Sequence, residues 1–249
     1  CGGRRRQGGA PSAGGAKNGL DRKLRILALH GGGANTKIME FQTISMQQAL
    51  GSRAEWVFLN GRRAWKEPPV GIIKALAAGE PIWGWYGVEN DDDTDRPYFE
   101  KLSDASVTFT YSELDASVDY VMDTISKKGP FDVLLGFSQG CIMTHLAAGI
   151  LRERGMPVPW KLSVHFCGMR VRDNRYAKMF ETPLAVPSVQ VYGRQDEFYE
   201  YGRASQPCMY EDALILEHDE GHKFPSKEPQ KTEIYDRVVQ EILKHCAAT

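Results

Sequence analysis

Short apolar runs alternate along this chain with segments whose apolar positions recur every three to four residues. The runs span five to seven residues, and turn-forming residues border most of them, as is typical of buried parallel strands. These runs predict strands at 24–30, 54–60, 131–135, 162–168, 187–193 and 213–218. The periodic segments predict helices at 36–50, 112–127, 139–154 and 231–245, the second of them with Ser112 as its N-cap.

Strands that alternate with helices predict an α/β fold with a doubly wound, mostly parallel sheet and helices on both faces. We expect residues 21–249 to form one domain, since such folds often reach this length undivided. Residues 61–110 lack a clear period and predict a long insert, a kind of segment that is often functional. Residues 1–20 are rich in Gly, Arg and Ala, which predicts a disordered tail, with a transit-peptide remnant as the alternative. Because the chain begins with Cys1, we expect the sequence to be incomplete.

Charge and cysteine content exclude several classes of partner. The 31 basic and 32 acidic residues nearly balance, so we expect neither nucleic acid nor an anionic membrane as a partner. No apolar run approaches the ~20 residues of a membrane span, so no integral membrane segment is expected. The five cysteines form no C-x-x-C pair, which predicts free thiols and a cytoplasmic location. The oligomeric state stays open.

The sequence GFSQG at 136–140 joins a predicted strand to a predicted helix. A G-x-S-x-G pattern is short, and its meaning depends on this setting, in which a sharp strained turn exposes the serine. The two glycines leave room for the turn, and the N-terminus of the following helix favours negative charge nearby. Ser138 is therefore the predicted nucleophile.

A serine nucleophile needs a base, and the base needs an acid that orients it. Asp196 stands three residues beyond Gly193 at the end of one predicted strand, and His222 follows the last predicted strand. The chain order Ser138, Asp196, His222 is the order of an α/β-hydrolase triad. This order predicts His222 as the base and Asp196 as the acid.

The sequence HGGGANT at 30–36 follows the first predicted strand and supplies a glycine loop for an oxyanion hole. The backbone N–H of Gln139 is predicted as one donor and that of Gly32 as the other. Gly33 is a further candidate for a residue that contacts the substrate. His30 is predicted to be a hydrogen-bonded structural residue rather than part of the site.

The stretches LHGGGANTKIMEFQ, GFSQG, VYGRQDEF and EGHKFP together resemble the FSH-type serine hydrolases, which include esterases and thioesterases. The resemblance covers about residues 22–245 and includes the aromatic insert and FCGMR. It implies an α/β-hydrolase fold and cleavage of carboxylic esters or thioesters without a cofactor. Ser138, Asp196 and His222 match the triad positions of that family.

The insert gathers aromatic residues at Trp65, Trp83, Trp85 and Tyr86. One interpretation makes them an apolar wall for the substrate, because clustered aromatics suit a concave apolar site. The other makes them core residues beneath a long loop. The sequence does not decide between the two.

Two stretches of the sequence superficially resemble metal-binding motifs, but each lacks residues that the motif requires. HDEGH at 218–222 lacks the glutamate and the helix of a zinc HExxH site, and the acidic run at 89–99 lacks the glycine of a calcium loop. No metal site is predicted.

The sequence thus predicts a serine hydrolase that acts on a small acyl ester or thioester, with acyl groups of small to medium size. An acyl-protein thioesterase or lysophospholipase of the same fold is one alternative. A non-catalytic binding module that keeps the fold is the other.

Overall fold

The computed structural model describes residues 22–67, 71–92 and 94–246, and the predicted tail at 1–20 lies outside this part of the chain. Its centre is a sheet of six strands, and every strand pairing within it is parallel. The order along the sheet is β10-β9-β8-β7-β1-β2. The strands are β1 Leu24–Leu29, β2 Ala54–Leu59, β7 Val133–Phe137, β8 Leu162–Phe166, β9 Ser188–Gly193 and β10 Ala213–His218. The predicted parallel sheet is confirmed.

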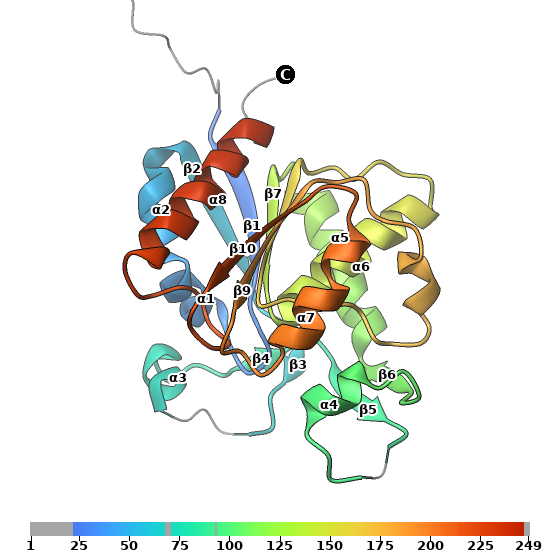
Figure 1. Ribbon diagram of the computed structural model, residues 1–249. Coiled ribbons are helices and arrows are strands. Elements are labelled where there is room, and N and C mark those ends of the chain that lie inside the picture. The colour runs from blue at the N-terminus through green and yellow to red at the C-terminus, as the bar shows by residue number, and fades with distance from the viewer. Residues whose placement is uncertain (1–21, 68–70, 93, 247–249) are drawn as a thin grey trace, which may run out of the picture.

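Helices cover both faces of the sheet (Figure 1). Alternate residues of β1 explain why. Leu27 and Leu29 join the core cluster beneath the helices at 114–128 and 139–153, whereas Ile26 and Ala28 join the cluster beneath the helices at 44–50 and 230–246. A strand with two apolar faces needs cover on both sides. The principal helices are α1 Thr36–Gln42, α2 Ile44–Leu50, α5 Leu114–Lys128, α6 Gln139–Glu153, α7 Tyr199–Ser205 and α8 Gln230–Cys246. Among the described residues, none of the helices is long and apolar enough to cross a bilayer.

Two helix predictions need correction. The helix predicted at 36–50 is divided at Thr43, whose hydroxyl donates to the carbonyls of Met39 and Glu40 at 2.8 and 3.2 Å. This back-bonding competes with the regular helical bonds and favours a bend. The N-cap predicted at Ser112 is also wrong, because Ser112 ends a strand and the left-handed Glu113 precedes α5.

The insert predicted as irregular contains short elements of its own. They are β3 Arg63–Ala64, α3 Gly71–Leu76, β4 Trp83–Gly84, β5 Gly87–Asn90, α4 Tyr98–Ser103 and β6 Phe109–Ser112. β3 pairs with β4 and β5 pairs with β6, so the insert forms two small antiparallel sheets. Figure 1 shows these elements gathered at one end of the central sheet. This is the carboxyl end of β1, which the loop at 30–35 follows.

The order in which strands are added to the sheet changes side between β1 and β7. From β1 the sheet grows to β2 on one side, and from β7 it grows through β8 and β9 to β10 on the other. Ligands of open α/β sheets bind in the crevice at the carboxyl ends of strands beside such a switch point. The glycine loop after β1 and the GFSQG turn after β7 both lie at this switch point.

Candidate active site

Ser138 lies in a sharp turn between β7 and α6. Its φ is 50° and its ψ is −116°, which is a strained conformation for a residue with a side chain. A Cβ atom on Gly140 would collide with the carbonyl oxygen of Leu29, and one on Gly136 would lie 2.6 Å from the nitrogen of Cys141. Gly140 therefore lets the turn pack against β1, and Gly136 lets the first turn of α6 lie close to β7. The turn leaves Ser138 partly exposed at the start of the helix.

Asp196 and His222 are joined by a hydrogen bond from His222 Nδ1 to Asp196 Oδ2 of 2.7 Å. Asp196 follows β9 and His222 follows β10, so neighbouring strands place them together. The Asp196 side chain is only 3% exposed, and its other oxygen accepts from the backbone of Phe198 at 2.9 Å. A carboxylate at Nδ1 holds the proton there and leaves Nε2 free to act as a base.

Aromatic rings position the His222 side chain beside the serine turn. The ring of Phe137 lies 5.1 Å from that of His222, and the ring of Phe198 meets it edge-on at 5.3 Å. Ser138 follows Phe137 directly. Among the described residues, no hydrogen bond joins the Ser138 hydroxyl to His222, and such bonds often tighten only when substrate is bound. The structure thus joins Asp196 to His222 and sets the His222 ring against Phe137, the residue before Ser138.

The glycine loop packs against the serine turn. A Cβ atom on Gly31 would lie 3.3 Å from Ser138 Cβ, and one on Gly32 would lie 2.9 Å from Gln139 Cδ. Gly32 and Gln139, the predicted oxyanion donors, are therefore neighbours. Both are partly exposed, as is Gly33, which has a φ of +68°. The N-terminus of α6 adds a favourable dipole at this point.

The predicted substrate wall divides into two groups. Trp85 is fully buried, and its indole N–H donates to the carbonyl of His30 at 2.7 Å. Tyr86 is also buried and stacks on Tyr111, with the ring centres 4.4 Å apart. Burial favours the core interpretation for both residues. Trp83 is half-buried and forms a backbone bridge to Ala34, next to the glycine loop.

His30 links the glycine loop to the insert. Its Nε2 accepts from the backbone of Gly61 at 2.9 Å, and its Nδ1 contacts the carbonyl of Gly31 at 2.6 Å. Nε2 is therefore unprotonated and Nδ1 carries the proton. Burial lowers the pKa of His30 to about 4, so the ring is neutral at neutral pH. These contacts agree with a structural role.

Cys167, Asp196 and His222 are a set whose donor atoms lie within 4.8 Å of one another. Such donors suit zinc in principle. Here Asp196 and His222 are already bonded to each other, and burial raises the pKa of the Cys167 thiol well above its ordinary value. A neutral thiol is a poor ligand. The geometry fits a hydrogen-bonded acid–base pair better than a metal centre.

Three further residues shape this site, and only Trp65 among them was part of the sequence predictions. Phe198 flanks His222, Cys167 lies against Asp196, and Trp65 packs on the glycine loop. Trp65 was recognised only as one of several aromatics in the insert. Phe198, two positions beyond Asp196, is the one that its place in the sequence could have indicated.

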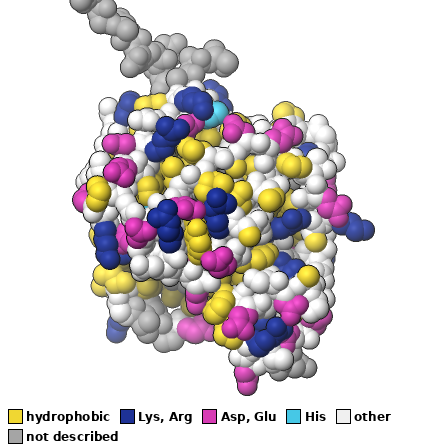
Figure 2. Space-filling view, in the orientation of Figure 1, with side chains coloured by type: hydrophobic (Ala, Val, Ile, Leu, Met, Phe, Trp, Pro, Cys, Tyr) yellow, Lys and Arg dark blue, Asp and Glu magenta, His cyan; other side chains and the backbone are white. Residues whose placement is uncertain are grey.

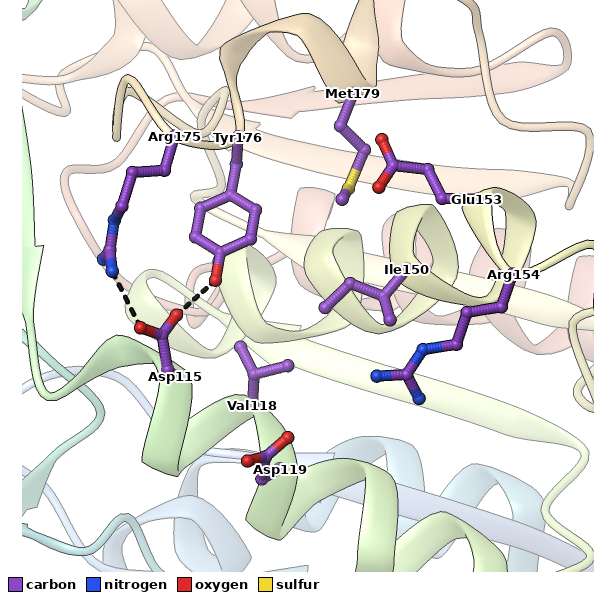
Figure 3. A pocket seen from close by; sticks show the side chains of 9 residues that line it. All are labelled: Asp115, Val118, Asp119, Ile150, Glu153, Arg154, Arg175, Tyr176 and Met179. Carbon is purple, nitrogen blue, oxygen red and sulfur yellow. Dashed lines mark hydrogen bonds and ion pairs between the residues drawn. The ribbon is translucent and has the colours of Figure 1, made fainter.

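A separate pocket lies between α5, α6 and the segment around Met179 (Figure 3). Arg175 and Tyr176 both bond to Asp115 there, so these polar groups satisfy one another. None of the predicted site residues lines this pocket. On the face of the molecule in Figure 2, acidic and basic side chains are interspersed.

Comparison with protein families gives a match to the family described as "Serine hydrolase (FSH1)" over residues 20–234. Esterase OVCA2 of Xenopus tropicalis is 26% identical over 229 residues, which cover 89% of this chain and 94% of that protein. Esterase FPY3 of Fusarium mangiferae is 24% identical over 236 residues, which cover 88% of this chain and 97% of that protein.

Two solved structures share the arrangement of this fold. Esterase PE8 aligns with a TM-score of 0.59 at 17% identity, covering 89% of this chain and 94% of that one. A single-residue variant of Arabidopsis thaliana SOBER1 aligns with a TM-score of 0.57 at 18% identity, covering 89% of this chain and 99% of that one. At such identities the likeness establishes the fold, and the predicted α/β-hydrolase fold is confirmed.

Proposed function

Because this chain belongs to the serine hydrolase (FSH1) family, we propose that it cleaves carboxylic esters or thioesters through an acyl-serine intermediate. It is a hydrolase of the esterase type. The proposal adds the residues, the mechanism and the substrates, which carry acyl groups of small to medium size. The observation that carries it is the 2.7 Å bond between His222 and Asp196 beside the strained Ser138 turn.

The first half of the reaction forms the acyl-enzyme. His222 Nε2 takes the Ser138 proton while the serine oxygen attacks the substrate carbonyl carbon. The carbonyl oxygen becomes negative and accepts hydrogen bonds from the backbone N–H groups of Gln139 and Gly32. The imidazolium, stabilised by Asp196, then gives its proton to the leaving alcohol or thiol.

The second half returns the enzyme to its starting state. A water molecule gives a proton to His222 as its oxygen attacks the acyl carbon. Collapse of the second tetrahedral intermediate releases the carboxylic acid, and the Ser138 oxygen recovers the proton. Every proton transfer uses residues of this chain, so the mechanism needs no cofactor.

Labelling with a fluorophosphonate tests the proposal directly. We expect stoichiometric modification of wild-type protein on the peptide that contains Ser138. The Ser138→Ala variant should not be labelled and should lose at least about 10³-fold in esterase turnover. Ser112→Ala, in β6 of the insert, is a matched control that should keep both labelling and turnover.

The outcomes separate the alternatives. A folded wild-type protein that resists labelling would favour the non-catalytic binding module. A labelled enzyme that acts on lipidated peptides far better than on small acyl esters and thioesters would favour the acyl-protein thioesterase alternative. Labelling at a different serine would refute the assignment of Ser138.

A further inference from the structure

Three glycines hold the indole of Trp65 against the oxyanion loop. A Cβ atom on Gly32 would lie 3.0 Å from the six-membered ring, and one on Gly84 would lie 3.1 Å from it. A Cβ atom on Gly33 would lie 3.1 Å from the five-membered ring. Contacts this close exclude any larger side chain without displacement of the indole. Gly32, Gly33 and Gly84 thus form a floor that fits this ring, and we call them the glycine floor.

The indole is also held from the insert side. The backbone N–H of Trp65 donates to the carbonyl of Ile82 at 3.2 Å, and the ring packs on a small cluster that includes Ile82 and Ala34. Trp65 nevertheless remains only half-buried, unlike the fully buried Trp85. The ring therefore lies beside Gly32, the proposed oxyanion donor, in a residue that the fold does not fully enclose.

The proposed mechanism assigns directions around the reacting carbon. The oxyanion points to the N–H groups of Gln139 and Gly32, and the leaving group must reach His222, which lies between the rings of Phe137 and Phe198. The acyl group takes the remaining direction, along the glycine loop on which Trp65 rests. Resting on the proposed function, we propose that Trp65 determines specificity by forming the acyl-side wall of this site.

This position makes the wall selective for shape close to the carbonyl. An indole that lies beside an oxyanion donor leaves room for a flat or linear acyl group and restricts branching at the carbon next to the carbonyl. Pockets of this kind discriminate about 10-fold or more for each added carbon group. The substrate class expected for this enzyme is therefore unbranched acyl esters or thioesters.

Two ester series test the inference. One series varies the acyl group of nitrophenyl esters from acetate through longer linear chains to the branched isobutyrate and pivalate. The other keeps acetate and varies the alcohol. We expect Trp65→Leu to raise the ratio of kcat/KM for branched over linear acyl groups at least about 10-fold. The ratios within the alcohol series should stay unchanged.

A second variant moves the wall without removing it. Gly84→Ala places a methyl group against the indole and should push the ring toward the substrate, so the branched-to-linear ratio should fall. Trp56→Leu is a matched control. Trp56 is a half-buried tryptophan of β2 that stacks on Phe58 and packs against the other core cluster, so its ratios should equal those of wild type.

Two different results would overturn the role that we propose for Trp65. If Trp65→Leu lowers kcat/KM by the same factor for every ester, Trp65 only supports the loop and the inference fails. If it alters the alcohol series instead, Trp65 faces the leaving group and the acyl assignment is wrong. Fluorophosphonate labelling of each variant separates these results from failure of the proposed function, which would abolish labelling of the wild type.

Discussion

The strand ends and the insert build opposite sides of the site in different ways. Asp196 and His222 follow adjacent strands of one parallel sheet, so the main-chain ladder of that sheet fixes their separation. The insert has only two small two-stranded sheets and reaches the site through a few bonds. Its anchors include His30, which bonds to Gly61 and Trp85, and the side chain of Gln139. The proposed reaction geometry thus depends on the sheet, and the proposed acyl-side wall depends on the insert.

The largest effect should come from the sheet side. Asp196→Asn keeps the size of the side chain but removes the charge and the preferred tautomer of His222, so kcat should fall about 10³- to 10⁴-fold. Asp212→Asn, in an exposed position before β10, is the matched control. Steady-state kinetics with a nitrophenyl ester measures both, and circular dichroism checks the fold. A loss below about 10-fold for Asp196→Asn would remove the acid from the proposed triad.

The next effect concerns pH at the junction of the two sides. Because burial lowers the pKa of His30 to about 4, the native ring stays neutral while an unfolded ring gains a proton below about 6.5. The contribution of His30 to the free energy of unfolding is therefore fully present above about pH 6.5. It is lost as the pH decreases toward 4, and the loss amounts to at most about 3 kcal/mol.

His30→Gln tests this linkage, because an amide can accept from Gly61 but does not titrate. We expect the free energy of unfolding, measured with urea at several pH values, to decline less steeply in the variant than in wild type between about pH 6.5 and 4. The buried His145 and His165 also have lowered pKa values, so part of the decline should remain. Identical slopes for the two proteins would contradict the role of His30.

The smallest effect should come from the Gln139 side chain. Its Oε1 accepts from the backbone of Trp85 at 3.1 Å, and its Nε2 donates to the carbonyl of Tyr86 at 3.5 Å. Gln139→Leu keeps the proposed oxyanion N–H but leaves these groups unpaired. We expect a loss of about 1 to 3 kcal/mol in unfolding free energy.

The kinetic consequence should separate the two sides of the site. Gln139→Leu should raise KM more than it lowers kcat, because it loosens the insert and not the triad. Gln47→Leu, on α2, is the control that removes two side-chain hydrogen bonds outside the site. A fall in kcat alone would place Gln139 with the reacting groups rather than with the insert.

The same contrast explains what could be predicted from the sequence. Ser138, Asp196 and His222 could be placed because each follows an apolar run, and parallel strands bring their carboxyl ends to one edge. The bond between His222 and Asp196 agrees with that placement. The α/β fold could be predicted from the same alternation.

The structure of the insert could not be predicted in this way. Its strands of two to four residues are too short to show a period. The burial of Trp85 depends on a bond to His30, 55 residues away in the chain, which no local pattern encodes. The position of Trp65 depends on glycines in two segments. The break at Thr43 also escaped prediction, because apolar spacing continues through it.

The bridge between Ala34 and Trp83 uses main-chain atoms alone, with N···O distances of 3.2 and 2.7 Å. Side-chain identity at these positions can therefore change without removing the attachment. Gly140, whose extra atom would strike the Leu29 carbonyl, allows no such freedom. In evolution, the chain can explore new substrates by altering the insert while its attachment to the catalytic loop persists.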